Sequence, residues 1–301
     1  MESAEPVRRT SEIEEFTNFY FIHPLAGWLT PLLAAMHVSP NAVSLTGMLF
    51  GILAGFAYCH YLHLPWAVAG FILMLAWHVM DGADGQLARL THSQSEFGKV
   101  LDGICDYVTF IAVYVGLASV LSRQYGAWMW ALVVAAGGCH AVQASAYEAQ
   151  RQEYSFWGHG RASMKLPDLD VALPDTVAPS PLLWLMNFLY RHYVRLQWAV
   201  SGADPAFHRR MLEILGREPE RSEAIRARYR AVFAPVLRRW SILSANYRTL
   251  GIFVCAAFKV PQYYFGFEIV GFSTILVALL SGHRARIASF LGDLDADEEA
   301  S

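Results

Sequence analysis

The chain has 301 residues, of which 55% are hydrophobic and only 16% are charged, and its formal net charge is −3. Soluble domains carry about 25% charged residues, so this composition excludes an ordinary soluble domain and indicates a membrane protein. The small net charge favours no class of partner, and no nucleic-acid partner is expected. Four cysteines lie scattered in apolar stretches without a Cys-x-x-Cys pair, which argues against a disulfide framework or a zinc site.

Six apolar stretches predict membrane-spanning helices, since a hydrocarbon core of about 30 Å requires roughly 20 apolar residues. The last two are the shortest: Ala42–Leu62, Trp66–Ala88, Val100–Leu121, Ala127–Tyr147, Tyr247–Phe258 with its flanks, and Phe267–Leu280. The preceding run, Glu12–His37, is amphipathic and rich in aromatic residues, which is typical of an interfacial helix. We therefore predict an all-α integral membrane protein with six transmembrane helices behind an interfacial amphipathic N-terminal helix.

The placement of lysine and arginine predicts the orientation, because cytoplasmic loops carry an excess of both. With a cytoplasmic N-terminus, the external loops hold only Arg123 and Lys259. This orientation puts both termini and the turn Thr91–Glu96 on the cytoplasmic side of the membrane. If the source is bacterial, that membrane is expected to be the inner membrane.

A long segment, 148–246, separates the fourth and fifth predicted spans as a helical cytoplasmic or interfacial insertion. Prolines predict a loop over 165–183. The apolar stretch Pro181–Val200 is interrupted by basic residues and favours an interfacial helix. The stretch Pro205–Arg239 is rich in arginine and helical in pattern. Its arginines either bind anionic headgroups or a phosphorylated substrate, or form a solvated basic face near the inner leaflet, and we favour the solvated face.

The predicted organisation has five parts. Residues 1–37 form the cytoplasmic or interfacial N-terminal segment, and 38–147 form the first four, catalytic, membrane helices. The insertion 148–246 follows, then the last two membrane helices in 247–290. The acidic tail 291–301 includes Asp293–Glu299 and is expected to be disordered.

Four aspartates, Asp81, Asp84, Asp102 and Asp106, lie near the predicted cytoplasmic ends of the second and third spans. Asp81 and Asp84 are three residues apart, and Asp102 and Asp106 are four apart, so each of these two pairs lies on one face of its helix. Between the pairs, Ser93-Gln-Ser-Glu96 fits a capping box that would start the third span with Ser93 as its N-cap. Two antiparallel helices are thus expected to face each other with two carboxylates each.

These carboxylates are costly in a membrane, at about 2.5–3.5 kcal/mol each. Arg89 and Lys99 supply only two positive charges. Divalent cations compensate the remainder, since hard metals prefer carboxylate oxygens, so we predict a Mg²⁺ or Mn²⁺ site. A structural ion-pair network is the alternative. The histidines His60, His63 and His78 are expected at span ends, in contact with water or headgroups.

The stretch from Asp81 to Asp106 reads D-x-x-D-G-x-x-A-R-(x8)-G-x-x-x-D-x-x-x-D. It resembles the signature of the CDP-alcohol phosphotransferase (CDP-alcohol phosphatidyltransferase) family at every defined position. Members also often carry Pro-Asn before the first span, here Pro40-Asn41. The resemblance covers Glu12–Tyr147 well and the last two helices loosely, whereas 148–246 departs from the compact members.

The resemblance implies a two-metal site in which Asp81, Asp84 and Asp102 bind the metals and Asp106 is a further ligand or the general base. It also implies a pocket for cytidine diphosphate, formed by Gly85, Ala88, Arg89 and Gly98, with Ser95 and Asn41 as weaker candidates. The implied reaction is attack of an alcohol oxygen on the β-phosphorus of a CDP-alcohol, with release of CMP.

Such a transferase serves phospholipid biosynthesis and acts on a CDP-alcohol donor and an alcohol acceptor, at least one of them a lipid. CDP-diacylglycerol is the preferred donor; a small soluble CDP-alcohol with a lipid acceptor is the second candidate pair. Two different functions compete with this transferase: that of an intramembrane prenyltransferase and, last, that of a cation transporter. Members of the family commonly form homodimers, which is an implication of the resemblance alone.

Overall fold

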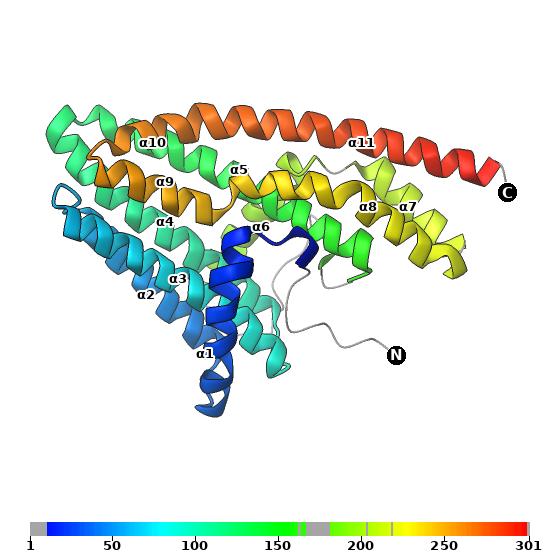
Figure 1. The fold of residues 1–301 in the computed structure, drawn as a ribbon, viewed down its shortest axis with the longest axis horizontal. Coiled ribbons are helices and arrows are strands. Elements are labelled where there is room, and N and C mark those ends of the chain that lie inside the picture. Colours follow the sequence, from blue (N-terminus) through cyan, green and yellow to red (C-terminus); the bar gives the residue numbers. More distant parts are fainter. Residues whose placement is uncertain (1–10, 162–163, 167–180, 203, 218, 300–301) are drawn as a thin grey trace. The chain divides into compact units, whose positions relative to one another are not determined.

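The computed structural model describes residues 11–161, 164–166, 181–202, 204–217 and 219–299. Within these ranges the chain is helical with short connections and contains no strand (Figure 1). It forms two compact units, the first made of Met1–His140 with Ala245–Gly271 and the second of Ala141–Ser244 with Phe272–Ser301. The all-α prediction is confirmed for the described residues, and most of the predicted loop 165–183 lies outside them.

Five helical stretches in the described part of the chain are long and apolar enough to cross a membrane. They are α2 (Pro40–Tyr58), α3 (Leu64–Leu90), Phe97–Tyr125 of α4 (Glu96–Tyr125), α5 (Trp128–His159), and Pro261–Ala296, which passes through α10 (Pro261–Phe267) into α11 (Ser273–Glu299). The fifth predicted span falls on α9 (Ala245–Ala257), which has only 13 residues. A span of about 20 residues needs more, so the count of six stays a prediction.

The predicted N-terminal helix corresponds to a π-helical turn, Asn18–Ile22, that leads into α1 (His23–Ala35). Its outer side carries exposed aromatic side chains, among them Tyr20 and Trp28. The inner side packs on α3, where a β-carbon at Gly82 would lie 3.3 Å from Cβ of Ala26. The helix is therefore amphipathic within the first unit, and its place in the membrane interface stays a prediction.

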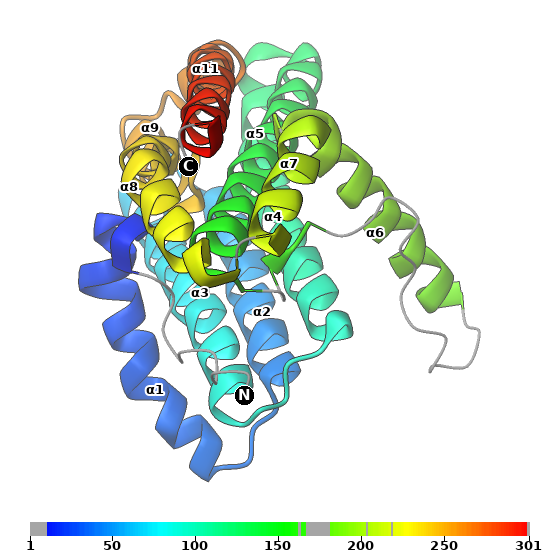
Figure 2. The same ribbon diagram turned by 90° about the vertical axis from the view of Figure 1, so that its right-hand side faces the viewer.

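Small residues bring α2 and α4 close together in the first unit (Figure 2). A β-carbon at Gly51 would collide with Thr109, and one at Gly116 would collide with the carbonyl oxygen of Gly55. Close backbone approach through glycine is the usual way in which membrane helices gain packing contacts. Since α3 also packs along α2, α2 holds the two aspartate-bearing helices in place.

A chain of buried polar side chains crosses the first unit. Arg248 of α9 donates to Glu268 over 3.2 Å, and both side chains are fully buried. The hydroxyl of Tyr264 donates to the other oxygen of Glu268 at 2.6 Å. The hydroxyl oxygen of Tyr114 in α4 lies 3.2 Å from the Tyr264 hydroxyl oxygen and 3.2 Å from Nδ1 of His140. These contacts tie the last helices of the unit to α4 and α5.

The second unit contains the remainder of α5 together with α6 (Pro181–Val200), α7 (Pro205–Arg217), α8 (Ser222–Trp240) and α11. The helical prediction for Pro205–Arg239 is confirmed for the described residues of that range, and α5 continues without a break past Tyr147.

Two arginines of α8 have a structural role rather than a solvated one. Arg226 donates to the carbonyl oxygens of Phe156 and Trp157, and Arg230 donates to that of Gly158. These carbonyls lie in the last turn of α5, and that of Phe156 also accepts from the backbone nitrogen of Gly160 at 3.0 Å, so the two arginines add to the cap of the helix.

The acidic tail is helical, which corrects the prediction of disorder for Asp293–Glu299. Helix α11 continues to Glu299 because no proline or loop segment interrupts it. Asp293 pairs with Arg228 at 3.3 Å, and Asp295 pairs with Arg210 at 2.6 Å. The acidic side chains therefore offset part of the positive charge of the arginines in α7 and α8. The prediction of disorder assumed that the acidic residues repel one another without nearby cations, and these ion pairs supply such cations.

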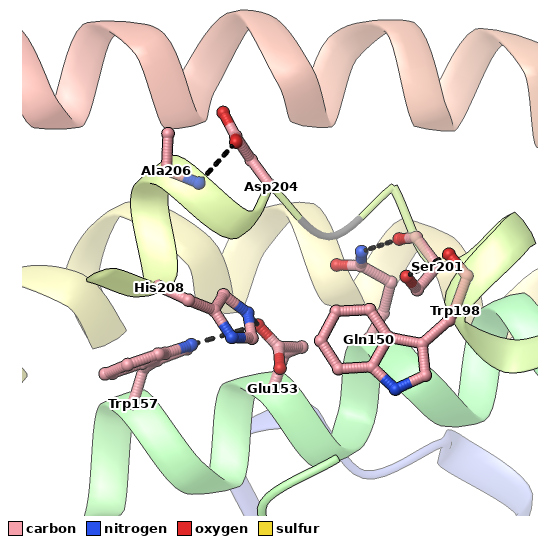
Figure 3. Close-up of polar contacts among 8 residues, drawn as sticks. All are labelled: Gln150, Glu153, Trp157, Trp198, Ser201, Asp204, Ala206 and His208. Atoms are coloured by element: carbon pink, nitrogen blue, oxygen red, sulfur yellow. Dashed lines mark hydrogen bonds and ion pairs between the residues drawn. The ribbon is translucent and has the colours of Figure 1, made fainter. Parts of the chain in front are cut away.

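A buried carboxylate fastens α7 to α5 in the second unit (Figure 3). Glu153 lies 2.6 Å from Nε2 of His208 and accepts a hydrogen bond of 2.9 Å from the indole of Trp157. The rings of Trp157 and Trp198 lie 5.2 and 5.9 Å from that of His208. This polar contact in an aromatic surrounding keeps α7 against α5.

His208→Ala is expected to destabilise the second unit, because Glu153 then stays buried without its strongest partner, at a cost of about 1–3 kcal/mol. The midpoint of thermal unfolding of the purified protein in detergent should fall. His192→Ala is the matched control, since His192 is exposed and its described contacts, a hydrogen bond to the carbonyl oxygen of Phe188 and a contact with the Phe188 ring, lie within its own helix. Equal midpoints for the two variants would contradict this role.

Candidate active site

Three of the four aspartates converge. Asp81 of α3 and Asp102 and Asp106 of α4 each offer one carboxylate oxygen, and these oxygens all lie within 4.8 Å of one another. All three residues are partly exposed. Mg²⁺ binds oxygen at 2.0–2.1 Å, so oxygens on opposite sides of one ion are about 4.2 Å apart. The spacing and the hard oxygen donors therefore fit a divalent cation.

Asp84 is directed elsewhere. It lies one turn further along α3, is buried, and accepts a short hydrogen bond on Oδ2 from the hydroxyl of Ser44 in α2. Sequence reasoning did not find Ser44. Ser44 lies three residues after Asn41, at the start of the first predicted span, and this closeness to a predicted pocket residue was the one hint in the sequence. The spacing does not predict which carboxylate the Ser44 hydroxyl contacts.

Asn41, Ser95 and Gly98 come together where α2 and α4 begin. A β-carbon at Gly98 would lie 3.1 Å from Oγ of Ser95 and 3.4 Å from Oδ1 of Asn41. Ser95 is the N-cap of α4, and its hydroxyl accepts from the backbone nitrogen of Gly98 at 3.0 Å. The prediction of Ser93 as N-cap is wrong, because the Ser93 hydroxyl bonds to that of Thr91 instead, at 2.7 Å.

Gly85 and Arg89 form a second pair of predicted pocket residues. A β-carbon at Gly85 would lie 3.4 Å from Nη1 of Arg89, so the guanidinium folds back over the glycine. The carbonyl oxygen of Ala88 accepts from the nitrogen of Ser93 at 2.9 Å, which closes the end of α3. A larger side chain at Gly85 would push the guanidinium away, whereas the role of Ala88 in a pocket stays a prediction.

His78 is a further residue that the sequence misplaced. It lies inside α3 rather than at a span end, and it is buried, with Nε2 3.0 Å from the hydroxyl of Thr249 in α9. The predicted span Trp66–Ala88 begins and ends close to the bounds of α3. The burial of His78 could not be predicted from that span, because it depends on how α9, a segment distant in sequence, packs on α3. His78 therefore joins α3 to α9 one turn before Asp81.

Comparison with known proteins identifies the class. Residues 37–194, slightly more than half of the chain, match the family model described as CDP-alcohol phosphatidyltransferase. The chain therefore belongs to the CDP-alcohol phosphatidyltransferase family. The match extends beyond Tyr147, where the predicted resemblance ended, through the end of α5 and into α6. Together with the five apolar helices, membership supports an integral membrane protein.

One curated relative is cholinephosphotransferase 1 from Gallus gallus, which is 31% identical over 103 residues. The aligned stretch covers 32% of this chain and 30% of the relative. The chain is thus similar to less than a third of that protein's length.

Proposed function

We propose that the protein is a membrane-embedded, metal-dependent phosphotransferase of phospholipid synthesis. It transfers the substituted phosphate of a CDP-alcohol to an acceptor alcohol and releases CMP. The observation that carries this proposal is the convergence of Asp81, Asp102 and Asp106 within 4.8 Å inside the region that matches the family. A purely structural ion-pair network would require enough cations beside these acids, and between Asp81 and Asp106 the sequence holds one arginine, Arg89, and one lysine, Lys99, for four aspartates.

The four aspartates would hold a two-metal site, in which Asp84 lies apart from the other three, with Asp106 also the general base. Divalent metal held by these carboxylates would offset the charge of a diphosphate and polarise its phosphorus. Asp106 takes the proton of the acceptor hydroxyl as its oxygen attacks the β-phosphorus; the bond from that phosphorus to the oxygen bridging to CMP breaks, and CMP departs with the electron pair. Proton removal by a positioned side chain contributes typically about 10²–10⁴-fold to the rate.

The remaining motif residues would bind the cytidine diphosphate. The planar guanidinium of Arg89 offers paired donors suited to phosphate oxygens. The guanidinium lies over Gly85, where a β-carbon would be 3.4 Å from Nη1, so a larger residue at this position would disturb Arg89, which supports a joint role for the two residues. Asn41, Ser95 and Gly98 supply polar groups close to one another at the start of α2 and α4, which supports a shared contact with the nucleotide.

The substrates are proposed at the level of class. CDP-diacylglycerol with a water-soluble alcohol is the first candidate, because a membrane-embedded site suits one lipid and one soluble partner. The name of the relative, cholinephosphotransferase 1, favours the second candidate, a small soluble CDP-alcohol donor with a lipid acceptor. The excess of Lys and Arg on one side supports an active site at the cytoplasmic face.

The purified protein in lipid nanodiscs should form CMP from at least one CDP-alcohol and acceptor pair, and only when Mg²⁺ or Mn²⁺ is present. A panel crosses CDP-diacylglycerol, CDP-choline and CDP-ethanolamine with glycerol phosphate, serine, inositol, inositol phosphate and diacylglycerol. Release of CMP is measured directly, with chelator as the control. If no pair yields metal-dependent CMP, the proposal fails; diphosphate release from a prenyl diphosphate or ion flux without CMP would support the prenyltransferase or the transporter.

A further inference from the structure

The contact between Ser44 and Asp84 joins two buried side chains from different helices. The hydroxyl of Ser44 donates to Oδ2 of Asp84, and the exposed fractions of the two residues are 7% and 5%. The same hydroxyl also lies 3.2 Å from the carbonyl oxygen of Pro40 in its own helix. A serine carries only one hydroxyl proton, and an ionised acceptor forms the shorter and stronger bond. The proton is therefore directed to the aspartate.

This behaviour differs from that of a neighbouring hydroxyl on the same helix. Thr46, two residues further along α2, donates to the carbonyl oxygen of Ala42 at 2.8 Å. Such a bond to the carbonyl four residues back is the usual way in which a hydroxyl in a membrane helix is satisfied. Ser44 has the same option at Pro40, yet its short bond crosses to α3. The packing of α2 on α3 thus selects the contact with Asp84.

From this geometry we infer that Ser44 is a positioning residue of the metal site, an inference that rests on the proposed function. By donating to Oδ2, Ser44 fixes the rotation of the Asp84 carboxylate and takes up part of its charge. Asp84 would then contribute a carboxylate of fixed orientation to a cation site beside the group formed by Asp81, Asp102 and Asp106. Hydrogen-bond partners of metal ligands typically change metal affinity about 10–100-fold when they are removed.

The alternative is that the bond only fastens α2 to α3. The two roles differ in what they change, because a fastening bond alters stability without altering the affinity of the folded protein for metal. A carboxylate that has lost its orientation alters metal affinity even when the protein is fully folded. The measurement must therefore report metal binding in the absence of turnover.

The test is a titration of the purified full-length protein with Mn²⁺, in which electron paramagnetic resonance counts the free ion. Ser44→Ala should raise the dissociation constant about 10–100-fold, and Ser44→Cys, a weaker donor of similar size, should give a smaller increase. Thr46→Val is the matched control and should bind like the wild type. Circular dichroism on the same samples establishes that each variant is folded.

A wild-type dissociation constant in folded Ser44→Ala, or in Ser44→Cys if the alanine variant does not fold, overturns the inference. The proposed function is tested separately by CMP release from the wild type. If the wild type forms CMP and binds Mn²⁺ but the serine variants bind it equally well, only the role of Ser44 is wrong. If the wild type binds no Mn²⁺, the metal site and the role of Ser44 fail together.

Discussion

Asp106→Asn is expected to lower the rate of CMP formation by about 10²–10⁴-fold, the contribution typical of a positioned general base. The asparagine keeps the size of the side chain and a carbonyl oxygen that can still ligate a hard cation. It cannot accept the proton of the acceptor hydroxyl. Binding of the CDP-alcohol should therefore persist while turnover is lost. Single-turnover release of CMP and equilibrium binding of the donor measure the two effects separately.

Asp81→Asn is the matched control, because Asp81 contributes an oxygen to the same group but is proposed only as a metal ligand. Its activity should fall through weaker metal binding and should recover as Mg²⁺ or Mn²⁺ is raised. The loss in Asp106→Asn should not recover. Full activity in Asp106→Asn would show that the base is another residue, and recovery with metal would make Asp106 a ligand alone.

Spacing along helices predicted that three of the four aspartates come close together. Residues three or four apart share a helix face whatever the rest of the fold does, so the convergence of Asp81 with Asp102 and Asp106 needed only the correct helices and a short turn between them. The contact of Gly98 with Ser95 is also local, within the first turn of α4, but the capping-box pattern placed the N-cap at Ser93 and did not predict this contact. For the three aspartates the sequence carries the geometry.

Contacts between distant segments were not predictable in this way. Ser44 and Asp84 are 40 residues apart, and their meeting depends on the rotation of α2 against α3. That rotation is set by side-chain packing, as where a β-carbon at Gly47 would approach Cβ of Met80 to 3.1 Å. The contact of His78 with Thr249 likewise joins segments 171 residues apart. A hydropathy pattern predicts that a helix is buried, but it does not predict which polar side chains of two packed helices face each other.

The ion pair between Arg248 and Glu268 was also outside the reach of the sequence. Glu268 falls in the π-helical stretch Glu268–Phe272, between α10 and α11 and inside the apolar segment Pro261–Ala296. A charged residue in such a segment is costly unless it faces the protein interior and is paired. Arg248 and Tyr264 meet that requirement, so the apolar segment carries its carboxylate without exposing it to lipid.

Arg248→Met is therefore expected to destabilise the first unit by about 3–5 kcal/mol, the usual result of removing one member of a buried ion pair. The long apolar methionine replaces much of the volume of the arginine, so the loss comes mainly from Glu268, whose buried carboxyl group is left without the guanidinium. Unfolding of the purified protein in mixed micelles, followed by circular dichroism as the denaturing detergent is raised, measures the change.

The double variant Arg248→Met with Glu268→Gln distinguishes the charge from the packing. Glutamine keeps an oxygen that accepts from the Tyr264 hydroxyl, now 2.6 Å from the glutamate, but removes the buried negative charge. Because replacing both members of a buried pair with neutral groups is often close to neutral in stability, the double variant should recover most of the loss. If it is as unstable as Arg248→Met alone, the arginine stabilises α9 through its packing, and the buried charge of Glu268 is not the source of the loss.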